Sequence, residues 1–520
     1  DKRRLTDRLS ALASRRRAAH SVTRSETLLA RDIPVPLWAE RDIAGSYLEL
    51  RRPQEALALY QRVVADNPDD FDANLGLFYA LVETEQLDAA TDHIDRYAAR
   101  LPERRHLDGR YNGERLSADI TADRVRIFAD RLDEAQARID ARHDTIPYNS
   151  EARQSSASLA LARGWPRQGD EMLRRTIGSD PINPALYADL SETLLTLQDW
   201  PAARAALDYA TGLDRDNGAV RRTRRSYELH DSYELHVEAG YGEGQDVNYF
   251  GSRDWSIDSF LYSRPIADNW RVFAHNYSAS ADFFGENQTW IRSGAGVEWR
   301  QNDWRLTGEI NGGSGVKAGT TGTVRWKPDD HWSFYGAAES VTNQIPLRAV
   351  ADGIYASRVS LGTDWQQNES RKLALGAFSS DFSDGNLRTG VNAAWFERWA
   401  SGPKWMFETT LGADASRNSL DASVNYFNPK SDHSVWLTAA IENLTWRSYD
   451  HSFRQRLALT GGSYWQEFYG TGAIQAIEYT HRWELERDLS LRYGIGRLLR
   501  PYDGEREGRN FANLVLLWRF

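Results

Sequence analysis

The sequence predicts an α + β chain with two domains: residues 1–225 form an all-α superhelix of repeated helical hairpins, and residues 226–520 form a 16-stranded antiparallel β-barrel that crosses a membrane. Three observations support this division. Proline recurs at a regular interval in the first domain, and apolar and polar residues alternate in the second. Aromatic residues also concentrate in the second domain, which holds 16 of the 19 Trp and 46 of the 60 aromatic residues.

Composition excludes several classes of protein. The 520 residues exceed the length of a typical single domain. The absence of cysteine excludes disulfides, thiol catalysis and cysteine-ligated zinc, and no run of 18 apolar residues predicts a membrane helix. A net charge of −10 argues against a nucleic-acid partner. Most of the acidic excess belongs to the second domain, with 29 basic and 37 acidic residues against 35 and 37 in the first.

The first domain is predicted from five of its prolines, those at positions 34, 68, 102, 147 and 181. Three of the four intervals are equal and match the tetratricopeptide repeat (TPR), whose period is about 34 residues. Within the second helices a small residue precedes a larger apolar one by four positions, as at Ala56 and Tyr60, so both share one helix face. The third interval is longer and predicts a loop insertion near residues 102–115. A weaker copy over residues 3–36 leaves open a continuation of the array upstream of Asp1.

Acidic residues in the repeats are candidates for a groove that binds a cationic ligand or a partner. Repeat arrays of this kind bind through a concave face and rarely carry catalysis. The candidate residues are Asp66, Asp69, Asp70, Asp72, Glu83 and Glu85. The alternative interpretation is an ordinary solvated surface.

The second domain begins where the helical pattern stops. From Tyr233 onward, residues such as Leu235 and Val237 alternate with Glu234 and His236, which is the pattern of a half-buried strand. Sixteen segments of about ten residues show it: 233–241, 255–263, 270–279, 289–300, 304–312, 319–327, 332–340, 355–366, 372–380, 387–399, 404–413, 434–446, 453–464, 472–486, 489–499 and 510–520.

The connections between these segments predict an outer-membrane barrel rather than a soluble β-sandwich. Short polar connections alternate with long ones such as 414–433, as expected for periplasmic turns and external loops. Tryptophans near segment ends predict aromatic girdles at both membrane interfaces, and the terminal Phe520 is typical of bacterial barrels. Residues 422–427 also alternate, but a seventeenth strand breaks the order of short and long connections, so we assign them to an external loop.

If the apolar positions face lipid, the other positions face the lumen. The lumen-facing acidic residues are then Glu234, Glu238, Asp258, Glu298, Glu309, Glu339, Asp364, Glu408, Glu442, Glu478 and Glu484. The basic ones include Arg292, Arg300, Arg305, Arg325, Arg358, Arg388, Arg454, Arg456, Arg482 and Arg492. We interpret the acidic residues as polymer-binding groups that make weak, repeated contacts, with Phe260 and Tyr262 as stacking surfaces. Cross-strand ion pairs and packing of the wall are the alternative.

Four stretches resemble the export porin family for poly-β-1,6-N-acetyl-D-glucosamine (PNAG) of biofilm-forming Gram-negative bacteria. They are YFNPKSD at 426–432, LTWRSY at 444–449, YWQ at 464–466 and RPYDGERE at 500–507. The resemblance implies an outer-membrane channel for partially deacetylated PNAG, a linear polysaccharide that carries free amines. It also implies a TPR domain in the periplasm that docks the periplasmic deacetylase and guides polymer into an acidic lumen.

Three other functions stay open on the sequence. A cellulose-type exporter of the same architecture needs lumen aromatics more than acids, and a TPR-barrel assembly scaffold needs no open lumen. An enzyme needs a nucleophile and a base together, but His236, His275 and His481 are scattered and no G-x-S-x-G motif is present. We therefore predict that the chain is not an enzyme and uses no cofactor or metal.

Overall fold

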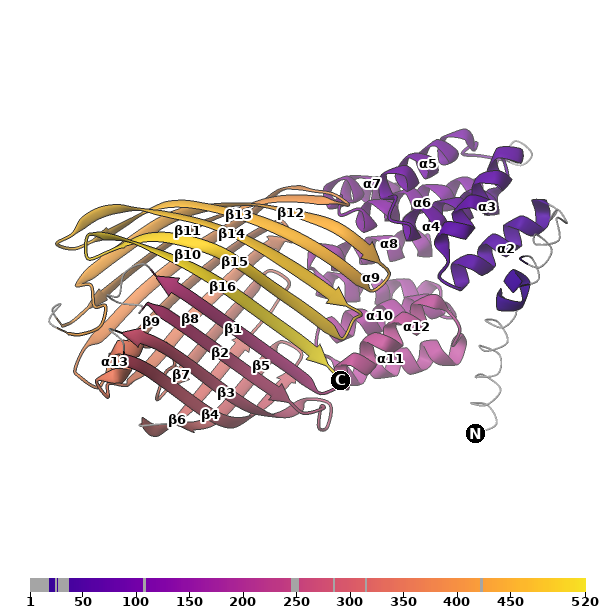
Figure 1. Cartoon of the computed structure of the whole chain (residues 1–520). Helices are drawn as coiled ribbons and strands as arrows, with labels where there is room; N and C mark the ends of the chain where they lie inside the picture. Colours follow the sequence, from indigo (N-terminus) through magenta and orange to yellow (C-terminus); the bar gives the residue numbers. More distant parts are fainter. Residues whose placement is uncertain are drawn as a thin grey trace.

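The computed structural model describes residues 18–23, 26, 37–105, 109–244, 252–283, 286–313, 316–420 and 424–520. A helical domain and a closed β-barrel lie end to end (Figure 1). This confirms the predicted fold class. In the part of the chain that the structure describes, no helix is long and apolar enough to cross a membrane.

The helical domain is a series of antiparallel helix pairs. Its helices are α2 (Leu37–Glu49), α3 (Pro53–Asp66), α4 (Phe71–Glu83), α5 (Leu87–Arg100), α6 (Gly113–Phe128), α7 (Leu132–Thr145), α8 (Ser150–Arg163), α9 (Pro166–Ser179), α10 (Pro184–Thr196), α11 (Trp200–Leu213) and α12 (Gly218–His230). The extra residues of the longer proline interval form the connection between α5 and α6, as predicted. The weaker copy over residues 3–36 lies almost wholly outside the described residues.

Small residues let the paired helices approach. Ala56 and Ala90 are fully buried at the positions that the repeat pattern predicts, and Tyr60 and Ile94 fill the space beside them. Helix α12 continues through His230, past Arg225 where the sequence places the junction, and the first strand begins at Glu234.

The barrel consists of β1 (Glu234–Gly244), β2 (Arg253–Tyr262), β3 (Trp270–Phe283), β4 (Glu286–Gln301), β5 (Trp304–Gly313), β6 (Val316–Trp326), β7 (Trp332–Glu339), β8 (Ala356–Asn368), β9 (Arg371–Phe382), β10 (Leu387–Ser401), β11 (Trp405–Asn418), β12 (Ser431–Ser448), β13 (His451–Gln466), β14 (Gly470–Leu485), β15 (Leu489–Tyr502) and β16 (Glu505–Arg519). Each strand pairs antiparallel with its neighbours in sequence, and β1 pairs with β16 to close the ring. Closure gives every described strand a partner on both sides, as a membrane requires.

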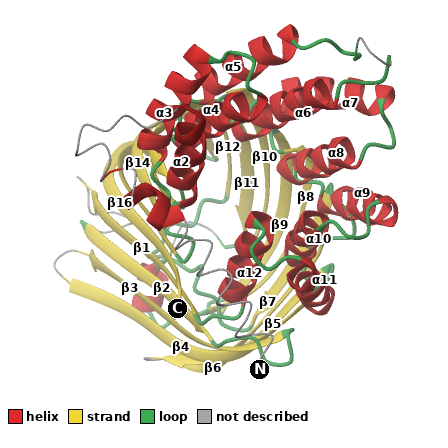
Figure 2. Ribbon diagram, turned by 90° about the vertical axis from the view of Figure 1, so that its right-hand side faces the viewer, coloured by secondary structure: helices red, strands yellow, loops and turns green. Residues whose placement is uncertain are grey.

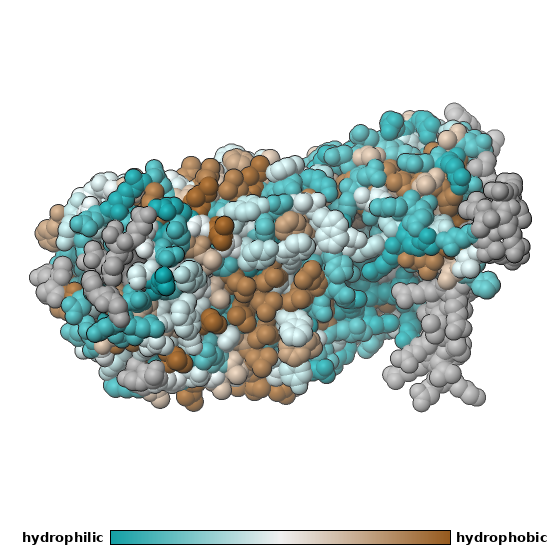
Figure 3. Space-filling view, in the orientation of Figure 1, coloured by the Kyte–Doolittle hydropathy of each residue, from teal (hydrophilic) through white to brown (hydrophobic). Residues whose placement is uncertain are grey.

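The outer surface of the barrel is apolar across its middle (Figure 3). Outward side chains such as Leu261, Ile310 and Leu361 are 44%, 70% and 63% exposed. Tryptophans gather at the strand ends next to the helical domain, where Trp304 stacks on Trp326. An exposed apolar band with aromatic residues at its edge is the surface expected in contact with lipid.

The far end of the barrel, which we call the distal mouth, differs from the sequence prediction. Strand β11 continues to Asn418 and β12 begins at Ser431, so the predicted loop 414–433 is shorter than expected, and residues 424–426 form bends. The β7–β8 connection carries a short helix, α13 (Leu347–Ala351), which packs on β3 and β4. The segment therefore folds over the mouth. Its Ile345 and Ala349 belong to a buried apolar cluster with Tyr426 of the β11–β12 loop.

Candidate functional site

The turns that join the two helices of each repeat, which we call the inner turns, contact the rim of the barrel. They are centred on Arg51, Glu85, Asp130, Gly164 and Gln198, and every one of these residues has a positive φ. Their spacing follows the proline intervals, with the one longer step between Glu85 and Asp130. Figure 2 shows the result: the helices follow an arc around the barrel opening, and α12 lies inside that arc.

These turns meet turns or strand ends of the barrel, and the first two, at Arg51 and Glu85, meet the same β12–β13 hairpin. In chain order the contacts join Arg51 to Asp450 (4.0 Å), Glu85 to Arg447 (2.7 Å), Asp130 to Arg398 (3.8 Å), Arg163 to Glu369 (3.1 Å), Gln198 to the N–H of Asn302 (3.2 Å) and Arg204 to Asp268 (2.5 Å). The repeats thus follow the rim from β12–β13 back to β2–β3, opposite to the strand order. At Gly164, φ is +84° and a Cβ would collide with the side chain of Gln366.

The contact between the repeats and the rim shifts the pKa of carboxyl groups that lie there. Burial raises the pKa of Asp450, but the hydrogen bond from Arg487 and the charges of Arg487 and Arg51 outweigh burial and hold that pKa below its usual value. Burial raises the pKa of Glu83, and the hydrogen bond to Tyr449 lowers it by less. The rim therefore holds ionised pairs together with a partly desolvated carboxyl.

The six candidate acids of the repeats lie in two separate places. Asp70 caps α4 by accepting from the N–H of Ala73, and Asp66, Asp69 and Asp72 surround the same helix start. Glu83 and Glu85 lie at the other end of α4 and contact the barrel at Tyr449 and Arg447. A 13-residue helix separates the two groups by roughly 18 Å at 1.5 Å per residue. The structure therefore places the two groups at opposite ends of one helix, and their binding of a cationic ligand or a partner stays a prediction.

Most of the predicted lumen acids are paired with arginine across the barrel wall. The pairs are Glu234–Arg519 (3.0 Å), Glu298–Arg300 (2.8 Å), Glu298–Arg305 (2.5 Å), Asp364–Arg325 (3.8 Å), Glu408–Arg456 (2.9 Å), Glu442–Arg454 (2.8 Å) and Glu484–Arg482 (2.7 Å). Five of these pairs join different strands and stiffen the wall, which is the alternative that the sequence left open. The pairs Glu298–Arg300 and Glu484–Arg482 each lie within one strand.

The other predicted acids have partners other than arginine. Asp258 and Glu309 hold His275 from both sides, at 2.8 and 2.9 Å. The remaining contacts join Glu478 to the amide of Asn513 (2.8 Å), Glu238 to His236 (3.4 Å) and Glu339 to Thr342.

The predicted stacking residues are engaged with each other. Phe260 stacks on the His275 ring at 4.0 Å and on Tyr262 at 6.0 Å, and Tyr262 also contacts Phe273 at 5.3 Å. Phe260 is therefore engaged by neighbouring rings of the wall.

A hollow of about 810 Å³ lies along the inner wall formed by β1–β3 and β11–β16. Glu238 and Glu478 line it together with the pairs Glu408–Arg456 and Glu442–Arg454. A second hollow, of about 450 Å³, begins at the helical domain and shares Glu408, Glu442 and Arg454 with the first. The two form a continuous polar path from the repeats into the barrel.

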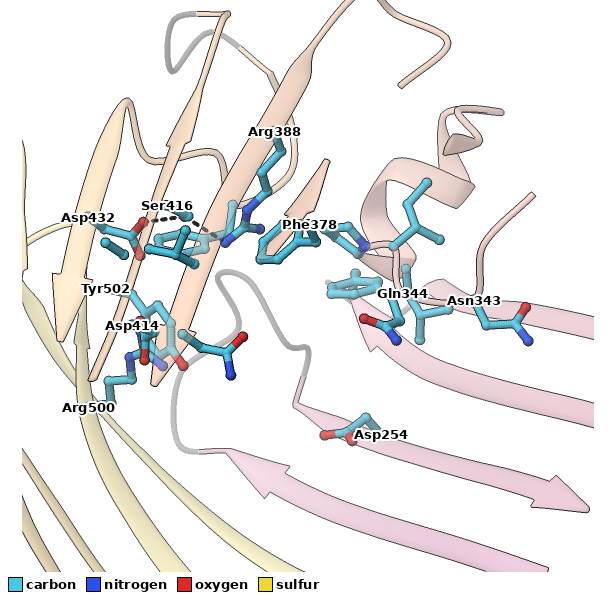
Figure 4. Close-up of a pocket in the computed structure, with 18 residues that line it drawn as sticks. Asp254, Asn343, Gln344, Phe378, Arg388, Asp414, Ser416, Asp432, Arg500 and Tyr502 are labelled. Atoms are coloured by element: carbon cyan, nitrogen blue, oxygen red, sulfur yellow. Dashed lines mark hydrogen bonds between the residues drawn. The ribbon is translucent and has the colours of Figure 1, made fainter. Parts of the chain in front are cut away.

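The structure adds lumen-facing acids that sequence reasoning missed. Asp254, Asp414 and Asp432 line a third cavity near the distal mouth (Figure 4). The sequence pattern misses Asp414 and Asp432 because it assigns residues 414–433 to a loop. Extending the period-two pattern of β11 from Glu408 by six residues reaches Asp414.

The fold and this polar interior define a membrane β-barrel protein of the outer-membrane type with a collar of helical repeats. Residues 229–520 match the family model of the PgaA membrane beta barrel domain, and the chain belongs to that family. Residues 47–109 match a tetratricopeptide repeat model.

Among curated proteins, the chain is similar to the poly-beta-1,6-N-acetyl-D-glucosamine export proteins of Escherichia coli strain K12 and strain O157:H7. It is 27% identical to each over 99% of its own length and spans 65% of theirs. It is also similar to a solved structure, a bacterial polysaccharide outer membrane secretin, at 26% identity and a TM-score of 0.52. That match covers 56% of this chain and 99% of the other. These are export proteins and a secretin, not enzymes, in agreement with the sequence prediction.

Proposed function

We propose that this chain is a porin that exports partially deacetylated PNAG across the outer membrane for biofilm formation. The observation that carries the proposal is the polar path along the inner wall. There Glu238 and Glu478 face an 810 Å³ hollow and, among the described residues, contact a histidine and an asparagine rather than an arginine. The matched families and relatives support the same substrate.

The arrangement of charges suits a polymer that must enter the pore and leave it again. Exposed ion pairs contribute only about 0.2–1 kcal/mol each, so an ammonium group that exchanges between Glu238, Glu478 and the paired acids is held weakly at every step. The arginines of the wall offer donors to hydroxyl and N-acetyl oxygens of the same chain.

We further propose that residues 1–225 form a periplasmic domain and residues 226–520 the outer-membrane barrel. The short barrel turns lie beside the helical domain, as periplasmic turns do. In this arrangement the periplasmic deacetylase docks on the repeats, and newly deacetylated polymer passes Phe128, which is half exposed at the entrance hollow. A cellulose-type polymer has no amine for Glu238 and Glu478.

The experiment is single-channel current in a planar bilayer with oligomers added on the helical-domain side. We expect partially deacetylated β-1,6-linked oligomers to block the current and cello-oligomers of equal length to have little effect. The double variant Glu238→Gln/Glu478→Gln should weaken the block several-fold. Glu397→Gln is the matched control, because Glu397 lies on the outer face beside Trp395.

Block by cello-oligomers alone would overturn the proposed substrate in favour of a cellulose-type polymer. Unchanged block in the double variant would remove these carboxylates from the path. A channel without current that binds neither oligomer would favour the assembly scaffold.

A further inference from the structure

A separate cavity of about 540 Å³ lies near the distal mouth (Figure 4). One side is formed by the β7–β8 segment, including Asn343 and Gln344, and the other by strands β9–β12 and β15. The volume falls within the range of about 300–1,000 Å³ that is usual for small-ligand sites. The cavity is distinct from the inner-wall path, because the two have different lining residues throughout the described chain.

Three of the four stretches that carry the family resemblance meet at this cavity. Phe427 and Asp432 come from 426–432, and Arg500 and Tyr502 come from 500–507. Tyr464, from 464–466, donates its hydroxyl to Asp432 at 3.2 Å. Segments far apart in sequence thus build one surface, which indicates a function for these stretches beyond strand formation.

Two of the three carboxylates of this cavity lack a basic partner, whereas Asp254 is paired with Arg509. Asp432 is only 5% exposed and accepts hydrogen bonds from Ser416 and Tyr464, while Asp414 accepts one from Ser434 at 2.6 Å. Among the described residues neither aspartate makes an ion pair with lysine or arginine, in contrast to Glu408 and Glu442 deeper in the barrel. A buried carboxylate that has only hydroxyl donors is stabilised by a cation brought by a ligand.

The same cavity also holds donors without acceptors. The Nε atoms of Arg388 and Arg500 are buried and find no hydrogen-bond acceptor in the part of the chain that the structure describes. The guanidinium of Arg500 lies over the ring of Tyr464 at 4.5 Å, and Arg388 donates through Nη2 to Ser416 at 3.3 Å. A ligand with carbonyl or hydroxyl oxygens satisfies such donors.

Aromatic rings supply the apolar part of the surface. Phe378, Phe427 and Tyr502 line the cavity, and Phe427 meets Tyr502 edge to face at 5.1 Å. Rings beside carboxylates and unsatisfied guanidinium donors fit an amino sugar, which presents C–H faces, an ammonium group and several oxygens.

The wall opposite these rings is held in place by two contacts. Trp290, 1% exposed, donates its indole N–H to the side chain of Asn343 at 3.1 Å, and Arg348 lies over the ring of Phe283 at 5.4 Å. The β7–β8 segment therefore closes one side of the cavity.

We propose that this cavity is an exit subsite that binds a deacetylated glucosamine unit together with its N-acetylated neighbour. The ammonium group lies between Asp414 and Asp432, and the acetyl or hydroxyl oxygens accept from Arg388 and Arg500. The proposal rests on the proposed export of partially deacetylated PNAG, and it adds a selective step at the distal mouth, after the inner-wall path.

The test is calorimetric titration of the purified full chain in detergent with two β-1,6-linked tetramers, one partially deacetylated and one fully N-acetylated. We expect the wild-type chain to prefer the partially deacetylated tetramer. Asp414→Asn/Asp432→Asn should weaken its binding at least tenfold while leaving the weak binding of the acetylated tetramer unchanged. Asp381→Asn is the matched control, because Asp381 is an exposed acid at the same end of the barrel.

A single variant and a second assay test the proposal even if the double variant does not fold. Asp414→Asn alone retains the hydrogen bond from Ser434, so it folds even if the buried Asp432 tolerates no change, and we expect it to weaken binding several-fold. Current block by oligomers added on the distal side should show the same order of variants. If Asp414→Asn binds the partially deacetylated tetramer as tightly as the wild-type chain, the exit subsite is overturned and the proposed export still stands. If the wild-type chain binds neither tetramer, the proposed export itself is overturned.

Discussion

An aspartate of the barrel caps a helix of the repeat domain. In the turn between β6 and β7, Asp330 accepts from the backbone N–H of Arg167 at 3.0 Å and of Gln168 at 3.1 Å. Helix α9 begins there, and among the described residues its own N-cap residue, Trp165, supplies no side-chain cap. The Asp330 side chain is 11% exposed, and the Arg167 guanidinium lies 3.5 Å from it. This one carboxylate supplies both the hydrogen bonds and the negative charge that a helix N-terminus favours.

The size of its contribution follows from these contacts. Losing an N-cap costs about 0.5–2 kcal/mol, and losing a negative charge at a helix N-terminus costs about 0.3–1 kcal/mol. The substitution Asp330→Ala therefore destabilises the start of α9 by about 1–3 kcal/mol, which corresponds to a roughly 5- to 150-fold change in local opening.

Hydrogen exchange measured by mass spectrometry reports this local opening. We expect peptides that cover the start of α9 to exchange faster in Asp330→Ala by that factor, while peptides of α4 and α5 keep their rates. The control Asp381→Ala removes an exposed aspartate at the distal mouth and should change nothing near α9. Equal exchange at α9 in Asp330→Ala and wild type would refute the assignment of Asp330 as a cap.

Three further predictions concern the barrel wall, the last helix of the repeat domain (α12) and the distal mouth. Gly462→Ala places a Cβ 2.5 Å from the backbone oxygen of Val435 and should lower barrel stability in urea titration, whereas Gly461→Ala meets no atom of the described chain within 4 Å and should be neutral. Burial and nearby arginines lower the pKa of His230 to about 3, so the unfolded chain takes up a proton below about pH 6.5 and the folded chain does not. Stability should therefore fall as pH decreases from about 6.5, and thermal unfolding of His230→Gln should show a smaller slope. Asn386→Ala removes the buried amide that joins β9–β10 to the 424–430 segment, and trypsin should then cut that segment faster than in wild type.

The sequence predicted the parts of this fold that depend on a local period. The regular proline interval identified the helix pairs. The alternation of apolar and polar residues identified sixteen strands and the positions that face the lumen, because each pattern reflects burial of one face. It could not predict α13, whose five residues are too few for a period. It also could not predict the contact between Arg163 and Glu369. These residues are 206 positions apart in the sequence, and no local pattern links them.

The contact between the two domains explains why the repeats keep their spacing. Each repeat presents its inner turn to the rim, and at Arg51, Glu85, Asp130 and Gln198 that turn adopts a positive φ without glycine, a conformation that costs of order 1–3 kcal/mol. The additional residues of the longer proline interval lie in the α5–α6 connection, which joins two repeats rather than the helices of one. An insertion there leaves the next inner turn, at Asp130, in contact with Arg398, whereas an insertion inside a repeat would displace the turn that docks. In this chain the change in length therefore lies between two repeats and leaves the docking turns in place. The proline interval varies, while the number of residues from each inner turn to the helix that follows it does not.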